Sequence, residues 1–267
     1  RQIFYDSVLH RIWFTTGVGL YYYSLLSGKT TKTIFQVAGS SSVDYVRNFL
    51  RLNNDELLMA RLDGVYRLNN EGNEGHLIRE FGINGINHLC GLSGNRLALS
   101  VIGQPLKIYS YSAGFTLKEE QLIDINNTIM MVSEDVNTGT IWAATEHGLY
   151  KIDNRSYKIL RHFTLDDGMA NDFIYAALPD KHGWIWCSTN KGIVAINQAN
   201  GEIRNFDISQ NLQDREFNNR AFFSDNEGYI YFGGVKGLNY FKPPYLDKDT
   251  IQPKLVIENI ILNNLDY

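Results

Sequence analysis

The chain lacks several features that would have narrowed its class at once. Among its 267 residues are only five prolines and two cysteines, and two cysteines decide nothing about the redox environment. No run of about 18 apolar residues occurs, so the sequence predicts no membrane-spanning helix. Lysine and arginine total 25 against 29 acidic residues, a formal net charge of −4 without a basic patch. Nucleic acid is therefore not an expected partner.

Aromatic residues and glycine are abundant instead. They include 16 tyrosines, 14 phenylalanines and 23 glycines. Aromatic side chains favour pleated, half-buried surfaces, and glycine supplies the turns between strands. No apolar stripe of helical period and useful length competes with this pattern. The composition therefore favours an all-β fold.

A repeated segment gives the architecture. Residues 141–150 read Ile-Trp-Ala-Ala-Thr-Glu-His-Gly-Leu-Tyr, and related segments occur at 12–21, 185–194 and 230–239, with weaker copies at 57–66 and 97–109. One position in each copy serves as an anchor: Trp13, Leu58, Ala98, Trp142, Trp186 and Tyr231. Successive anchors lie 45, 40, 44, 44 and 45 residues apart. Four short strands with intervening turns fit each period, which is the signature of a β-propeller blade.

We therefore predict a β-propeller of four-stranded blades over residues 1–243. Six repeats are visible, and they either close a six-bladed ring or form part of a seven-bladed one. The anchor tryptophans are predicted to fill the gaps between blades, and the glycines that open the third strands to adopt positive φ. Cys90 and Cys187 fall on different strands two blades apart, too far for a disulfide. Residues 244–267 are predicted to be a linker and the first strand of a truncated β-sandwich domain.

Three motifs carry a resemblance to a known family. They are the Trp-x-x-Thr-x-x-Gly-Leu-Tyr pattern, the Asp-Lys-His-Gly-Trp-Ile-Trp stretch at 180–186, and the connector at 163–171. Together they resemble the two-component regulator propeller repeats, and residues 252–260 resemble the first strand of the β-sandwich that follows such propellers. The resemblance implies the periplasmic sensor of a hybrid two-component histidine kinase, which reads an oligosaccharide. It also implies a homodimer, held in the inner membrane only through segments downstream of this chain.

The residues themselves show little sign of catalysis. The six histidines fall at non-equivalent positions of the repeat, so neither a metal site nor a cofactor is predicted. No phosphate loop or nucleophile elbow occurs. The fragment is therefore predicted not to be an enzyme. A propeller hydrolase or lyase, which would need convergent carboxylates, and a protein-interaction propeller remain the alternatives.

Ligand-binding residues are expected in two sets of loops on one face, the outer-to-inner connectors and the turns between second and third strands. Three of these residues, Arg215, Arg220 and Lys236, would suit an acidic sugar. Asn218 has a second interpretation, as a structural part of the Glu-Phe-Asn connector at 216–218. The predicted ligand-binding residues are Glu146, His147, Asp172, Asn190, Lys191, Arg215, Glu216, Asn218, Arg220 and Lys236.

Overall fold

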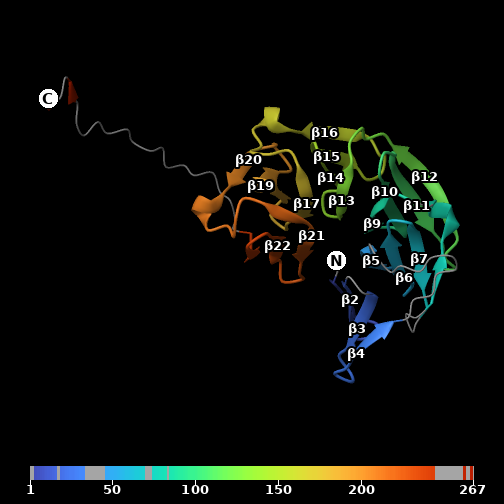
Figure 1. Ribbon diagram of the computed structural model, residues 1–267. Helices are drawn as coiled ribbons and strands as arrows, with labels where there is room; N and C mark the ends of the chain where they lie inside the picture. Colours follow the sequence, from blue (N-terminus) through green and yellow to red (C-terminus); the bar gives the residue numbers. More distant parts are fainter. Residues whose placement is uncertain are drawn as a thin grey trace.

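The computed structural model describes residues 3–16, 19–33, 46–69, 74–82 and 84–243, together with the strand residues 261–262 and 265–266. Six antiparallel sheets stand around a common axis as the blades of a propeller (Figure 1). The all-β propeller predicted from the repeat is confirmed.

Each blade is a meander whose first strand lies nearest the axis. Blades one to three comprise β1 (Ile3–Asp6), β2 (Arg11–Thr16), β3 (Gly19–Ser24), β4 (Thr30–Thr33); β5 (Val46–Arg51), β6 (Leu57–Arg61), β7 (Gly64–Leu68), β8 (Gly75–Leu77); and β9 (Ile86–Leu92), β10 (Arg96–Val101), β11 (Leu106–Tyr111), β12 (Leu117–Ile123). Blades four to six comprise β13 (Ile129–Asp135), β14 (Thr140–Thr145), β15 (Gly148–Asp153), β16 (Ile159–Phe163); β17 (Ile174–Pro179), β18 (Trp184–Thr189), β19 (Gly192–Asn197), β20 (Ile203–Phe206); and β21 (Phe217–Ser224), β22 (Ile230–Gly234), β23 (Gly237–Phe241). The sixth blade thus has three described strands. Short 3₁₀ turns at Arg79–Phe81, Leu165–Asp167 and Ile208–Gln210 lie in the connectors that follow blades two, four and five.

The glycine that opens each third strand has the predicted positive φ in all five expected blades. Gly192 shows why no other residue fits. Its φ is 93°, and a Cβ atom would lie 2.1 Å from the backbone oxygen of Phe206 on the outer strand. The close approach of β20 to the turn therefore requires glycine.

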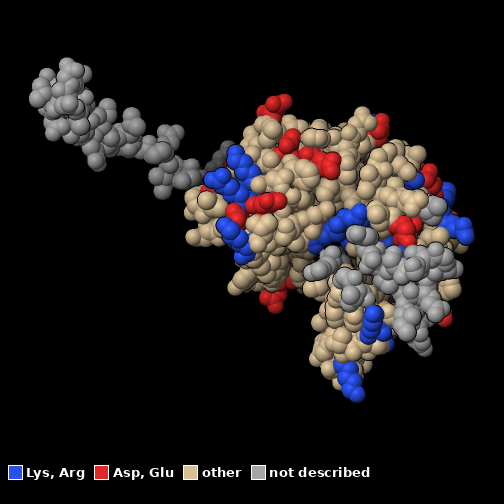
Figure 2. Space-filling model, viewed as in Figure 1, with Lys and Arg blue, Asp and Glu red and all other residues tan. Residues whose placement is uncertain are grey.

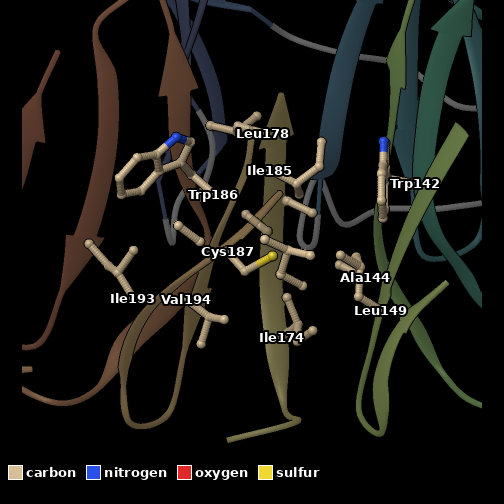
Figure 3. Close-up of a cluster of buried hydrophobic side chains, with 14 of the residues drawn as sticks. Trp142, Ala144, Leu149, Ile174, Leu178, Ile185, Trp186, Cys187, Ile193 and Val194 are labelled. Atoms are coloured by element: carbon tan, nitrogen blue, oxygen red, sulfur yellow. The ribbon is translucent and has the colours of Figure 1, made fainter. Parts of the chain in front are cut away.

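The core lies between the blades rather than within them. Buried apolar side chains form clusters that each span neighbouring blades, and Trp13 and Trp142 are fully buried in them. Along β18 the side chains alternate: Ile185 faces Trp142 of the preceding blade, whereas Trp186 turns the other way (Figure 3). Trp186 meets Phe241 of the next blade, with ring centroids 4.9 Å apart. The predicted inter-blade position of the tryptophans is confirmed.

An aspartate at the end of the first strand fixes the anchor in three blades. In the fifth blade, Oδ1 of Asp180 accepts hydrogen bonds from the backbone N–H groups of His182 and Trp184. Its Oδ2 accepts the indole N–H of Trp186 at 2.7 Å. Asp6 and Asp225 make the same arrangement with Trp13 and Tyr231. One carboxylate thus closes the turn and orients the aromatic ring.

The two cysteines are both free thiols, as predicted from their positions. Cys90 lies on β9 and Cys187 on β18. Burial raises the pKa of the Cys90 thiol to about 12, and Glu134 contributes in the same direction. These cysteines therefore behave as core residues rather than nucleophiles.

The six blades do not close on one another. Neighbouring inner strands pack from β1 through β21, but an open sector separates the last blade from the first (Figure 1). Apolar side chains of the first blade face this sector, with Ile3 73% and Tyr5 54% exposed. On the last blade, Phe223 and Tyr240 are 61% and 65% exposed. The equivalents of those two residues in the fifth blade, Leu178 and Ala195, are buried.

The predicted linker and sandwich strand fall mainly on residues 244–260, which lie outside the described residues. β24 (Ile261–Leu262) pairs with β25 (Leu265–Asp266). Among the described residues, no helix has the length and apolar character needed to cross a membrane.

Candidate functional site

One face of the propeller is built from the turns between second and third strands and the connectors that lead into each inner strand. We call it the connector face. The two sets of loops are joined by backbone hydrogen bonds: Gly148 donates to the carbonyl of Asp172 at 2.7 Å, and Gly192 donates to that of Arg215 at 2.6 Å. The predicted loop residues therefore come from neighbouring blades and share one surface.

One of the predicted charges on the rim of this face has an acidic partner. Lys236 lies 3.0 Å from Asp214. Hydrogen bonds from Ser209, with smaller effects of Arg215 and Lys191, lower the pKa of Asp207 below its usual value. The side chains of Lys191, Asp207, Arg215 and Lys236 are exposed, so these charges are solvated.

An aromatic pair lies further inward on the same face. Phe173 and Tyr175, at the start of β17, have ring centroids 5.1 Å apart and are both half-buried. The Tyr175 hydroxyl donates to Oδ1 of Asn190 at 2.5 Å. Burial raises the pKa of Tyr175, with a smaller effect of Glu216 on the next connector. The two rings are inclined at 57° to each other, and the polar groups of Asn190 and Glu216 lie near Tyr175.

The inner strands share a β-bulge at the same place. In four of them a single residue has no partner on the second strand: Arg47 in β5, Asn87 in β9, Met130 in β13 and Tyr175 in β17. In β21 the bulge is wider, because the four residues 218–221 stand opposite the single Gly233. A bulge frees its residue from the regular alternation and re-aims the side chain, which is why bulges collect near binding sites.

Two bulge residues meet across the axis. Nη2 of Arg220 in the sixth blade donates to Oδ1 of Asn87 in the third blade at 2.9 Å. Asn87 is itself held by its amide, which donates to the backbone oxygen of Ile129 at 2.6 Å. Because blades three and six stand on opposite sides of the ring, this contact places the Arg220 guanidinium at the centre. Figure 2 shows a group of basic side chains at this point of the ring.

The channel below this contact is filled by a histidine and a phenylalanine. The rings of His88 and Phe222 lie 6.3 Å apart, again between blades three and six. On the far side of them is a cavity of about 560 Å³, lined in part by Cys90, Met131 and Glu134. The bulge residues and this cavity therefore occupy opposite ends of the axis.

The structure divides the ten predicted residues rather than gathering them into one pocket. Arg220 reaches the axis, and Asn190 contacts the aromatic pair. Seven others lie on the rim or in the connectors, and Asn218 is exposed within the wide bulge of β21. The sequence did not predict Arg47, Asn87 and Tyr175 as residues of the site. Their spacing could have indicated them: the bulge residues recur at 40- to 45-residue intervals, like the anchors, but without a common residue type.

Groups of histidine, cysteine and carboxylate side chains that could hold a metal ion do not occur in the part of the chain that the structure describes. The polar groups at the axis are guanidinium, amide and imidazole. This set suits the binding of a polar ligand rather than acid–base chemistry by paired carboxylates.

Comparison with known proteins agrees with this architecture. No protein-family model matches the chain. The extracellular domain of the proposed hybrid two-component system BT3049 from B. thetaiotaomicron superposes with a TM-score of 0.80 at 24% identity, over 97% of this chain and 36% of that one. The extracellular domain of the proposed one-component system BT4673 from the same organism gives 0.65 at 16% identity, over 86% of this chain and 31% of that one.

A curated relative is Histidine kinase P4 of Formosa agariphila, 24% identical over 98 residues, which are 37% of this chain and 7% of the kinase. The chain therefore spans about a third of its structural neighbours and a small part of this relative. At these identities the likeness establishes the fold. The chain is a β-propeller similar to those in extracellular domains of two-component systems, the group that the sequence motifs resemble.

Proposed function

We propose that this chain is the ligand-sensing propeller of a hybrid two-component signalling protein and that it binds an oligosaccharide on the connector face. The observation that carries the proposal is the set of bulge residues, which brings an aromatic ring, an amide and two guanidinium groups to the inner end of one face. The likeness to extracellular domains of two-component systems supports a periplasmic location.

The chemistry of the face suits a sugar. The half-buried rings of Phe173 and Tyr175 offer an apolar surface to the C–H groups of a pyranose. Asn190 and Asn87 supply amide groups for hydroxyls. Tyr175 and Asn87 stand on inner strands that are packed into the core, so this part of the site is rigid while the surrounding loops can vary.

Signalling needs no turnover. In the proposed protein, two sensors pair, and the ligand favours one of two arrangements of the pair. The shift cannot exceed the difference in the ligand's affinity for the two arrangements. Membrane attachment and the kinase would lie outside this chain.

The test is calorimetric titration of the protein with a panel of oligosaccharides, followed by chromatography for cleavage products. We expect one sugar class to bind and to be recovered intact. Tyr175→Ala should weaken that binding about tenfold or more, because it removes the stacking surface. The control is Tyr240→Ala. This change removes a ring that is 65% exposed on the open side of the last blade, and it should leave the affinity for the sugar unchanged.

Two outcomes would replace the proposal. Steady release of products that stops when a carboxylate near the axis is changed would make the protein a carbohydrate-active enzyme. Capture of a defined protein partner without any glycan binding would make it an interaction module.

A further inference from the structure

Two of the bulge residues, Arg47 and Arg220, are arginines without an anionic partner among the residues that the structure describes. Arg47 and Asn87 occupy the same bulge position on β5 and β9, which pack against each other, and Asn87 binds the guanidinium of Arg220. The bulges therefore bring the two arginines to the same part of the axis. Among the described residues, neither forms an ion pair, and the Nε atoms of both are buried without a hydrogen-bond partner. Two like charges beside the axis of a protein with net charge −4 require an explanation.

Burial makes the arrangement costly. It lowers the pKa of Arg47, and burial together with the charge of Arg47 lowers the pKa of Arg220 to about 10. Within the described part of the chain, Arg220 donates only to the neutral amide of Asn87. A guanidinium remains charged at physiological pH even so, and therefore favours an anion between the two groups.

The backbone is also specialised here. Among the described non-glycine residues with positive φ, Arg220 is the one that lies within a strand, at φ 63°. The other seven lie in turns or loops. Non-glycine residues in this region are unfavourable and persist where the surroundings hold them for a purpose. Here the conformation brings the guanidinium to Asn87 across the ring.

We infer that Arg47 and Arg220 bind a single anionic group, the carboxylate of a uronic acid or a sulfate ester, on the ligand that enters from the connector face. Arg220 is fixed by Asn87, and Arg47 closes from the second blade. Tyr175 and Phe173 contact the sugar that bears the anion. The inference rests on the proposed function and narrows its ligand to acidic oligosaccharides.

The experiment compares three tetrasaccharides, one containing uronic acid, one sulfated and one neutral, by calorimetry at about 0.15 M salt. At least one acidic sugar should bind about tenfold or more tightly than the neutral one. Arg47→Gln and Arg220→Gln should each remove that advantage. Arg155→Gln removes the same charge from an exposed turn between β15 and β16 and should retain it. The acidic tetrasaccharide whose affinity falls more in Arg47→Gln and Arg220→Gln identifies the anion as a carboxylate or a sulfate ester.

The anion site would be overturned if all three sugars bound equally well. It would also be overturned if both Arg47→Gln and Arg220→Gln still bound an acidic sugar more tightly than the neutral one. Either result would leave the proposed glycan sensor in place. Failure of every sugar to bind would count against the proposed function. The anion site is then tested without sugar, by thermal unfolding in sodium sulfate and in sodium chloride of equal ionic strength. Sulfate stabilises proteins in general, so the rise in unfolding temperature from chloride to sulfate is compared between proteins. The anion site predicts a larger rise for wild type and Arg155→Gln than for Arg47→Gln and Arg220→Gln.

The same melts test the state of the variants. Without ligand, Arg47→Gln and Arg220→Gln should unfold at a temperature no lower than wild type, because each relieves the repulsion between partly buried charges. A lower unfolding temperature for both would mean that the arginines hold the ring together, and the inference would be wrong.

Discussion

Replacement of Trp142 by alanine is expected to lower the free energy of unfolding by about 3–5 kcal/mol. Trp142 is fully buried between the fourth and fifth blades, against Phe163 and the face of β18 that carries Ile185. Packed blades on both sides prevent the site from collapsing, so the lost volume remains as a cavity. Urea unfolding of the variant measures the loss, and a loss below about 1 kcal/mol would contradict the packing described.

The indole N–H provides a matched control. In Trp142 the Nε1 atom is buried without an acceptor among the described residues, because Asp135 accepts a hydrogen bond from Gln198 at 2.8 Å instead. The Nε1 of Trp186 donates to Asp180. Trp142→Phe should therefore cost less than Trp186→Phe, by about 1 kcal/mol, the usual net contribution of a hydrogen bond. Equal losses would show that the aspartate contact contributes nothing.

Acidification from pH 7 to pH 4.5 is expected to destabilise the protein by about 2–3 kcal/mol through His88 alone. Burial, and then the positive charge of Arg220, lower the pKa of His88 from 6.5 to about 4. In the folded protein the ring stays neutral, and its Nδ1 accepts the backbone N–H of Val132 in the next blade at 3.2 Å. The unfolded chain takes up a proton near pH 6.5, so the contribution is complete above that pH and is lost as the pH falls toward 4.

The measurement is the difference in unfolding free energy between the two pH values, compared between wild type and His88→Asn. An asparagine oxygen can still accept from Val132 but does not titrate. Carboxylates elsewhere contribute equally to both proteins and cancel. If the variant loses as much stability as wild type, the low pKa of His88 is not a source of acid sensitivity.

The sequence was sufficient to predict the blades because their determinants are repeated residue types. The anchors Trp13, Trp142 and Trp186 fill equivalent spaces between sheets, and Gly148 and Gly192 meet the same close approach of an outer strand. Each type is dictated by packing that recurs in every blade. The same residue types therefore recur at a constant spacing, and the repeat can be recognised from the sequence alone.

The inner part of the site was harder to predict, because a bulge is a property of strand pairing rather than of residue type. Arg47, Asn87 and Tyr175 share a register position but no side-chain chemistry. Arg220 was predicted from its charge alone, and its contact with Asn87 joins residues 133 positions apart in the chain. The rim residues were predicted to lie on one face, but their mutual pairing, as between Lys236 and Asp214, depends on side-chain geometry.

The open sector between the last and first blades changes how the fold holds together. A closed ring unfolds as one unit, since every blade has two neighbours. Here the blades form an open array in which each end blade packs side by side with one neighbour, as in a solenoid, so stability is largely a sum of blade and nearest-neighbour terms. The contacts of the sixth blade with the third across the axis add to this sum. Opening is cheapest at the two ends and most costly in the fourth and fifth blades, where the largest cluster lies. A surface that covered Tyr5 and Tyr240 would join the two end blades and turn this array into a cooperative ring. Because the site is assembled from the second to the sixth blades, such a cover would itself raise the affinity of the site for its ligand.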